Sequence, residues 1–269
     1  MKRLLRLLTE LSSRKFVSVV AGRFAKSKLS KGLIPHFARV YDIRVDEAEK
    51  PLAQYETLNE FFTRRLKPGS RPIDPDPAAL ISPVDGVVTA VGKATQGKLL
   101  QIKGQDYDVV QLLGGSPRAI NYREGHYIVI YLSPSDYHRI HAPVSGDIVE
   151  SERIAGRVYP VNRFAMQHIR GVLSSNERLI TYIRHDGGEL ALVKVGALNV
   201  SSIQYIEPER RKLERGDELA MFEFGSTVVI LTEKDSFEPS ADLREDMRIR
   251  MGQPLGFLQS KKTRNVVEG

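Results

Sequence analysis

The chain of 269 residues contains no cysteine. Disulfide bonds and zinc sites with thiolate ligands are therefore excluded, and a reducing compartment such as the cytoplasm is the default expectation. The N-terminal segment also lacks a long hydrophobic run. Its longest stretch without a charged residue, Phe16 to Gly22, is far shorter than the ~20 residues that a membrane-spanning helix needs. The hydrophobic residues, 41% of the chain, suffice for one large domain with an ordinary core.

The net charge of +7 comes from one end of the chain. Residues 1–31 hold nine Lys and Arg residues and a single acid, Glu10, a net charge of +8, which leaves −1 for all the rest. The basic residues are Lys2, Arg3, Arg6, Arg14, Lys15, Arg23, Lys26, Lys28 and Lys31. A neutral body with a basic end does not indicate a nucleic-acid groove, and we expect no nucleic-acid partner.

The basic end also has an apolar face. On a helix, one side would carry Leu4, Leu5, Leu8 and Leu11, and apolar residues follow at 16, 17, 19 and 20. Such a helix lies in the membrane interface, where each basic residue gains roughly 1 kcal/mol from anionic headgroups. We expect residues 1–50 to be a basic amphipathic helical segment for membrane association. A solvated helix packed on its own domain and a cleaved signal peptide remain open.

The remaining pattern predicts an α+β fold whose body, residues 51–269, is mainly β. Residues 33–42 predict a short helix, and Thr57 with Glu60 forms a capping box for a helix that Pro68-Gly69 stops. From about residue 80, short β-rich runs alternate with turn residues, at 86–92, 98–104, 126–132, 178–184, 189–197 and 226–232. We expect hairpins that build a sandwich-like or barrel-like body.

A Pro-Val-x-Gly turn recurs in this body. Pro83-Val84-Asp85-Gly86 is echoed by Pro143-Val144-Ser145-Gly146, and residues 253–256 are a fainter copy. Such turns resemble those of lipoyl and biotinyl carrier domains, but the exposed lysine hairpin of a carrier is missing from the sequence. Because Ser145 replaces Asp85 in the second copy, the turn does not require a carboxylate. Asp85 has either a structural role, since Asp favours turns, or a chemical one.

Two histidines lie three residues apart. Ser133-Pro134-Ser135-Asp136 is typical of a helix start, so we expect a short helix that places His138 and His141 on one face. A metal site lacks a third ligand at a motif distance, and we expect no metal. Structural histidines and proton transfer remain as explanations.

The segment Gly225-Ser226-Thr227 lies between two apolar runs. Such a segment is commonly a simple turn. Glycine, however, has backbone freedom that would let the Ser226 hydroxyl reach the carbonyl carbon just upstream. An Asp and a His elsewhere in the chain could activate that hydroxyl.

Together these segments resemble the phosphatidylserine decarboxylases, in particular the membrane-associated bacterial type. Residues 224–227 are similar to the Leu-Gly-Ser-Thr processing motif of that family, with Phe224 in place of leucine. Further blocks occur in the family order, at 61–69, 83–86, 136–143, 159–162, 176–178 and 195–197.

The resemblance implies a decarboxylase that makes its own pyruvoyl cofactor. Asp85 would orient His141, and His141 would take the proton of Ser226, which attacks the Gly225 carbonyl. The cut would leave a β chain, 1–225, and an α chain, 226–269, with the pyruvoyl group in place of Ser226. That group would form a Schiff base with phosphatidylserine, and His138 would serve the decarboxylation that yields phosphatidylethanolamine. The bulky Phe224 would alter the rate of processing.

The resemblance also implies a homodimer attached peripherally to the cell membrane, at an anionic surface on the cytoplasmic face. Two other classes of function remain open on the sequence. A Ser-His-Asp hydrolase would use the same residues with Ser226 intact. A peripheral membrane-binding module would catalyse nothing.

Overall fold

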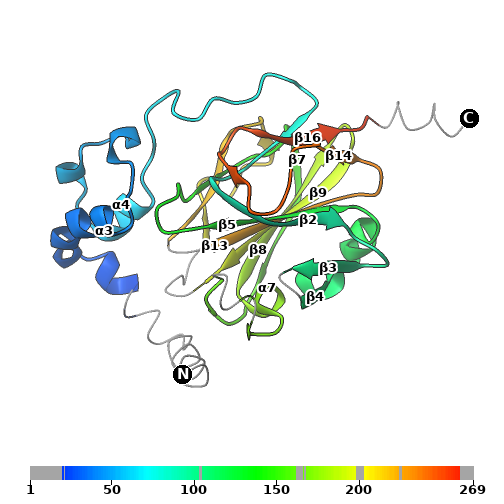
Figure 1. The fold of residues 1–269 in the computed structure, drawn as a ribbon, viewed down its shortest axis with the longest axis horizontal. Coiled ribbons are helices and arrows are strands. Elements are labelled where there is room, and N and C mark those ends of the chain that lie inside the picture. The colour runs from blue at the N-terminus through cyan, green and yellow to red at the C-terminus, as the bar shows by residue number, and fades with distance from the viewer. Residues whose placement is uncertain are drawn as a thin grey trace, which may run out of the picture.

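The computed structural model describes residues 20, 22–102, 105–161, 166, 168–197, 203–223 and 226–260, with only the backbone of 99–102. Figure 1 shows a group of short helices beside a larger β body, joined by a connecting chain that runs over the top of the body. The leucine-rich face at residues 4–11 lies outside the described residues. Among the residues described, no helix is long and apolar enough to cross a membrane.

After the helical residues 22–25, the helical part continues with the short elements η1 (Lys28–Leu33), α3 (Ile34–Val40), η2 (Val45–Glu47), η3 (Leu52–Gln54) and α4 (Leu58–Phe62). The expected capping residue begins α4, because Glu60 N–H donates to Thr57 Oγ1 at 3.0 Å. A hydrophobic cluster joins α3, η3 and α4 and includes Ile34, Leu58 and Phe61. The packed helical unit therefore extends past residue 50, the boundary expected from the sequence.

The body is built on one antiparallel sheet of eight strands. Their order is β11 (Lys212–Leu213), β7 (Gly146–Ile154), β8 (Arg178–His185), β9 (Gly188–Gly196), β13 (Ser226–Thr232), β5 (His126–Leu132), β2 (Gly86–Lys93) and β15 (Arg248–Ile249). The mainly β, α+β prediction is confirmed, and the predicted runs fall on β2, β5, β8, β9, β13 and a strand outside this sheet, β3 (Lys98–Ile102). The barrel-like alternative is wrong, because the outer strands β11 and β15 do not pair in the described structure and the sheet stays open.

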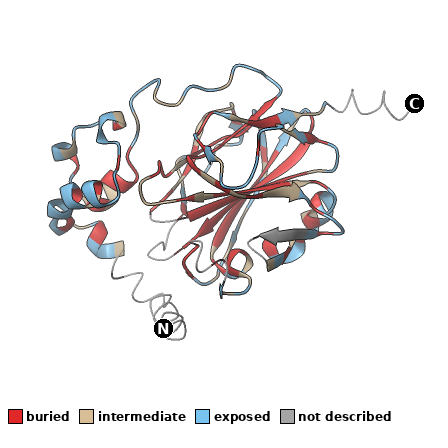
Figure 2. Ribbon diagram, viewed as in Figure 1, coloured by how far each residue is buried: buried red, intermediate tan, exposed pale blue. Residues whose placement is uncertain are grey.

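Both faces of this sheet are covered, and Figure 2 shows the buried residues concentrated along it. Two three-stranded sheets pack on one face, β1 (Ala79–Ile81) with β16 (Pro254–Leu258) and β14 (Phe237–Pro239), and β10 (Ile203–Tyr205) with β12 (Glu218–Phe222) and β6 (Arg139–His141). The opposite face is covered by β3 (Lys98–Ile102), β4 (Gln105–Asp108), α5 (Val109–Leu112), η4 (Pro117–Tyr122) and α7 (Val172–Ser175).

The repeated Pro-Val-x-Gly turns lead into two strands of the main sheet, β2 and β7. A Cβ atom on Gly86 would lie 2.4 Å from the carbonyl oxygen of Tyr131, and one on Gly146 would lie 2.2 Å from that of Arg184. Both glycines are therefore required where a neighbouring backbone approaches closely. This shared constraint explains the sequence echo without a carrier function.

The helix expected over residues 133–141 is wrong. Asp136 Oδ2 accepts hydrogen bonds from Ser133 N–H and Ser133 Oγ, each at 2.7 Å, which closes a single turn. The chain then enters β6 at Arg139 and pairs with β12. Because side chains alternate along an extended chain, residues three apart point to opposite sides. His138 and His141 therefore do not share a face.

Candidate active site

Ser226 is the first residue of β13, a strand that is paired on both edges. Ser226 lies opposite Leu132 of β5 and Gly196 of β9. The segment is rich in β-branched residues, which favour an extended chain in a buried sheet. The side chain is fully buried, and within the described residues its Oγ has no hydrogen-bond partner. Phe224 and Gly225 lie outside the described residues.

The direction of the Ser226 side chain follows from strand alternation. Val228 and Ile230 belong to the core on the face that β6 and β12 cover, whereas Val229 and Leu231 belong to the core on the other face. Ser226 is in phase with Val228, so its hydroxyl points toward the layer that contains β6.

His138 precedes β6 and is fully buried. Its Nδ1 lies 2.9 Å from the carbonyl oxygen of Asp136. A carbonyl only accepts hydrogen bonds, so Nδ1 carries the proton and Nε2 keeps a lone pair. Within the described structure this Nε2 has no hydrogen-bond partner, and the ring of Phe62 packs against the imidazole at 4.0 Å between centroids.

Burial lowers the pKa of His138 to about 3, because the charged imidazolium would lose its hydration. The ring is therefore neutral at physiological pH. A neutral imidazole with a free Nε2 is able to accept a proton.

The ladder between β6 and β12 brings His138 toward the cut site expected from the sequence. Glu218 lies opposite His141, and at the other end the Phe222 N–H donates to the His138 carbonyl oxygen at 3.0 Å. Phe222 is the residue of β12 nearest to Ser226 in the chain. Of the two histidines, His138 is thus the one at the Ser226 end of the ladder.

His141 has partners on both ring nitrogens. Nδ1 donates to the Gly216 carbonyl oxygen at 2.7 Å, and Nε2 accepts from the Tyr137 hydroxyl at 3.0 Å. Burial lowers the pKa of His141 as well. In this geometry neither nitrogen is free to receive a further proton.

Asp85 is buried in the turn before β2 and is held by an arginine. The Arg71 guanidinium donates to both carboxylate oxygens, with Nε 2.8 Å from Oδ1, and the Met251 N–H adds a bond of 2.9 Å. In the described structure no hydrogen bond joins Asp85 to His141. The predicted Asp85–His141 pairing is therefore not formed here, although the role of both residues in processing stays a prediction.

Sequence reasoning missed two arginines of this region. Arg71 lies in the connecting chain after Pro68-Gly69, and Arg64 follows α4. Charged residues in such segments usually face solvent, so the sequence does not indicate that either side chain is buried, although Arg64 lies in the block 61–69. The structure buries both, with Arg64 at 4% exposure and the Arg71 side chain at 5%.

A third buried cation, Lys194 of β9, is fully buried on the same face as Ser226. Its Nζ donates to Thr181 Oγ1 at 2.5 Å and lies 5.3 Å from the centre of the Tyr205 ring. Burial lowers its pKa, which favours the neutral amine. These contacts give Lys194 a structural role between β9 and β10.

A buried serine with an unpartnered hydroxyl, on the same side of the sheet as a neutral histidine with a free ring nitrogen, is the arrangement expected of an enzyme site. Comparison of the sequence with known protein families also indicates an enzyme. A family model described as phosphatidylserine decarboxylase matches residues 58–257, and the chain belongs to this family. It is thus a decarboxylase, and the resemblance carried by the sequence motifs is confirmed.

The chain is similar to the phosphatidylserine decarboxylase proenzyme of Bacillus thuringiensis (strain Al Hakam). The two are 45% identical over 252 residues, which cover 94% of this chain and 96% of the relative. Proenzymes of the same name from two strains of Bacillus cereus are also 45% identical over the same shares of both chains.

The buried state of His138 predicts a pH dependence of stability. Its pKa is about 3 in the folded chain and about 6.5 in an unfolded one. The neutral ring makes its full contribution to the free energy of unfolding above pH ~6.5. This contribution is lost as pH falls toward 3, at up to ~1.4 kcal/mol per pH unit.

The experiment uses a Ser226→Ala background, so that any self-cleavage at this residue is prevented. In this background His138→Asn should flatten the decline of unfolding free energy between about pH 6 and 4. Denaturant titrations measure the slopes. His36→Asn, at an exposed position of α3, is the control, and equal slopes for all three proteins would contradict the expectation.

Proposed function

We propose that the chain converts phosphatidylserine to phosphatidylethanolamine with a pyruvoyl group that it makes from its own Ser226. The observation that carries the proposal is the buried, unpartnered Ser226 Oγ at the start of β13. A hydroxyl without a partner in a closed core costs free energy. Its retention there fits a group that is consumed in a reaction of the chain itself.

In the first stage the Ser226 hydroxyl would lose its proton to a histidine. Its oxygen would attack the carbonyl carbon of Gly225, so that the peptide bond is replaced by an ester. Elimination would break the bond between the ester oxygen and Cβ of residue 226, which leaves a carboxylate on Gly225 and dehydroalanine at 226. Hydrolysis of the dehydroalanine would release ammonia and leave the pyruvoyl group. We assign the proton removal to His141 with Asp85, which requires His141 to exchange the partner it has now.

The residues around position 226 fit such a group. The position is buried and points toward the layer that contains β6, and His138 just before β6 has a neutral ring with one nitrogen free. The pyruvoyl carbonyl would react with the substrate amine and draw electrons from the bond to the carboxylate. His138 would orient that carboxylate and move the proton to the carbon that loses carbon dioxide.

We further propose that the helical segment holds the enzyme on the cytoplasmic face of the membrane as a peripheral protein. Seven large apolar side chains are exposed between residues 20 and 45, namely Val20, Phe24, Leu29, Leu33, Val40, Tyr41 and Val45. Such a concentration on one segment, among basic residues, suits an interface with anionic lipid. A homodimer stays a prediction.

The covalent state of the active protein tests the processing step. Denaturing intact-mass analysis should resolve two fragments, 1–225 and 226–269, with the smaller one lacking a free amino terminus. Ser226→Ala should leave one uncut chain without activity. A single species of 30.2 kDa with full decarboxylase activity would refute self-cleavage.

Separate variants of the two histidines test their roles. His141→Ala and Asp85→Ala should leave mostly uncut chain. His138→Ala should still be cut, but its turnover per pyruvoyl group should fall by roughly 10²–10⁴, the usual share of general acid–base catalysis. The cleaved fraction and the rate of carbon dioxide release are measured for each variant. Cleavage that survives in His141→Ala and is lost in His138→Ala would assign the activation of Ser226 to His138.

A matched pair of surface variants tests membrane attachment. Leu29 is 82% exposed on the helical segment and Ile120 is 69% exposed on the body. Leu29→Asp should weaken binding to anionic vesicles roughly tenfold, since a leucine contributes ~1.5–3 kcal/mol on burial, while Ile120→Asp should not. Point variants are preferable to removal of residues 1–31, because Ala25 and Ser30 are part of the packed segment. Vesicle co-sedimentation measures binding, and equal losses in the two variants would place attachment elsewhere.

A further inference from the structure

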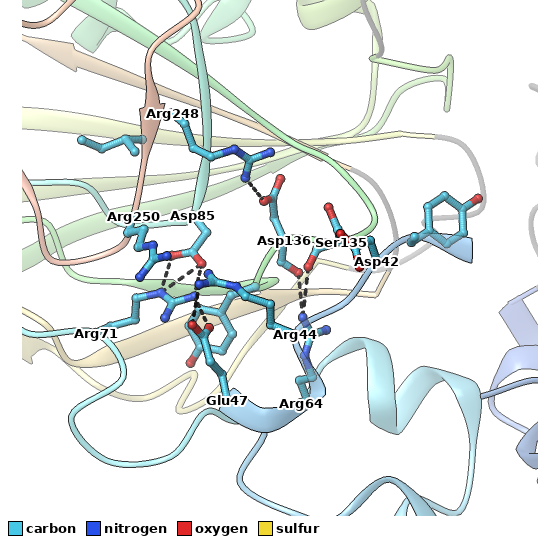
Figure 3. Close-up of a pocket in the computed structure, with 13 residues that line it drawn as sticks. Asp42, Arg44, Glu47, Arg64, Arg71, Asp85, Ser135, Asp136, Arg248 and Arg250 are labelled. Carbon is cyan, nitrogen blue, oxygen red and sulfur yellow. Dashed lines mark hydrogen bonds and ion pairs between the residues drawn. The ribbon is translucent and has the colours of Figure 1, made fainter. Parts of the chain in front are cut away.

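A cavity of about 310 Å³ lies where the helical segment meets the β body. Its wall contains five arginines, Arg44, Arg64, Arg71, Arg248 and Arg250, and four acids, Asp42, Glu47, Asp85 and Asp136. Figure 3 shows these side chains converging from η2, from the end of α4 and from the turn that holds Ser135 and Asp136. Such a density of charge in an enclosed space suits a charged ligand.

Most of these acids are already paired. Glu47 forms ion pairs with Arg44 at 2.7 Å and with Arg71 at 2.9 Å. Asp85 is bound by Arg71, and Asp136 pairs with Arg248 at 2.7 Å. These three acids therefore form ion pairs with Arg44, Arg71 and Arg248 and not with Arg64.

Arg64 has no such partner. Its Nη2 donates to the carbonyl oxygens of Ser135, at 3.1 Å, and Asp136, at 3.4 Å, as Figure 3 shows. Its Nε and Nη1 are buried without a hydrogen-bond partner, and no carboxylate of the described residues forms an ion pair with it. Burial lowers the pKa of Arg64, which reflects the missing hydration of its charge. A buried guanidinium with free N–H groups is costly unless an anion binds it.

The free guanidinium lies next to the proposed catalytic histidine. The carbonyl oxygen of Asp136 accepts from both Arg64 Nη2 and His138 Nδ1. Phe62, two residues before Arg64, packs on the His138 ring. An anion held by Arg64 would therefore lie beside the segment that carries His138.

The cavity also adjoins apolar surface. Tyr41 lines it and is 42% exposed, and Val40 and Val45 nearby in the chain are exposed as well. An amphiphile with a charged head and apolar tails fits a charged cavity beside such a surface, whereas a free phosphate ion would gain nothing from it.

We propose that Arg64 binds the phosphodiester of the phospholipid substrate in this cavity. The inference rests on the proposed function. The planar fork of arginine matches two phosphate oxygens. The substrate carboxylate is the weaker candidate, because a strong ion pair with the group that leaves as carbon dioxide would stabilise the ground state and slow the reaction. The phosphodiester keeps its charge throughout.

The test uses the full chain with Ser226→Ala, which cannot process itself, so that binding is measured apart from catalysis. The probe is dihexanoyl phosphatidylethanolamine below its micelle concentration, which has the phosphodiester but no carboxylate. Calorimetry should detect binding, and Arg64→Gln should weaken it roughly tenfold or more, the loss expected for charge-assisted hydrogen bonds. Arg123→Gln, at an exposed position of the body, should bind as the parent does.

Arg64→Lys keeps the charge but loses the fork, and its affinity should fall by an intermediate factor. If Arg64→Gln does not fold, the affinity of Arg64→Lys for the lipid probe is the test. An affinity equal to that of the parent then overturns the proposal. No binding by the parent, or equal binding by Arg64→Gln, also overturns it. If inorganic phosphate binds as tightly as the lipid probe, the cavity is a site for free phosphate and the proposal of a lipid headgroup site is overturned. An Arg64→Gln defect for dihexanoyl phosphatidylserine alone would assign Arg64 to the carboxylate.

Discussion

The pairing of β13 with a neighbour on each edge fixes the position of Ser226, the residue that we propose to react. Residue 226 begins that strand between Leu132 and Gly196, so it can neither leave the sheet nor turn its side chain to the other face without breaking both ladders. The same strand places four further residues in the two cores. A reactive serine at this position is thus as rigid as the core itself, which suits a reaction that needs the hydroxyl close to the preceding carbonyl.

The helical segment completes the site from outside the sheet. Phe62 packs on His138, Arg64 donates to the turn that contains Asp136, and the Thr63 carbonyl oxygen accepts from Arg139. The segment that carries the exposed apolar residues is therefore also in contact with the catalytic region. A membrane-bound substrate would meet both at once, since the charged cavity opens where the two parts join.

The polar groups of the proposed site share one electrostatic feature. They are buried, and some of their hydrogen-bonding atoms have no partner within the described residues. His138 stays neutral because its charged form would be desolvated, and the Ser226 hydroxyl and part of the Arg64 guanidinium lack partners within the described residues. Each of these groups costs stability as it stands. By contrast, Asp85 and Arg71 satisfy one another in a compact ion pair. The groups that lack partners are therefore those to which the substrate or the reacting chain would supply a partner. The Asp85–Arg71 ion pair, which has its hydrogen bonds, lies in the same region.

Local sequence was enough for the elements and for the family. The alternation of β-branched runs with turn residues predicted the six strand segments, the Thr57–Glu60 capping box predicted α4, and the processing motif pointed to Ser226, because these signals depend on neighbours in the chain. Tertiary structure decided what depends on distant pairing. The ladder of β6 with β12 replaced the helix expected at 133–141 and separated the two histidines, and Arg71 instead of His141 became the partner of Asp85. Arg64 shows the same limit: only the docking of α4 against the turn at Asp136 buries its charge, and no pattern within the chain encodes that contact.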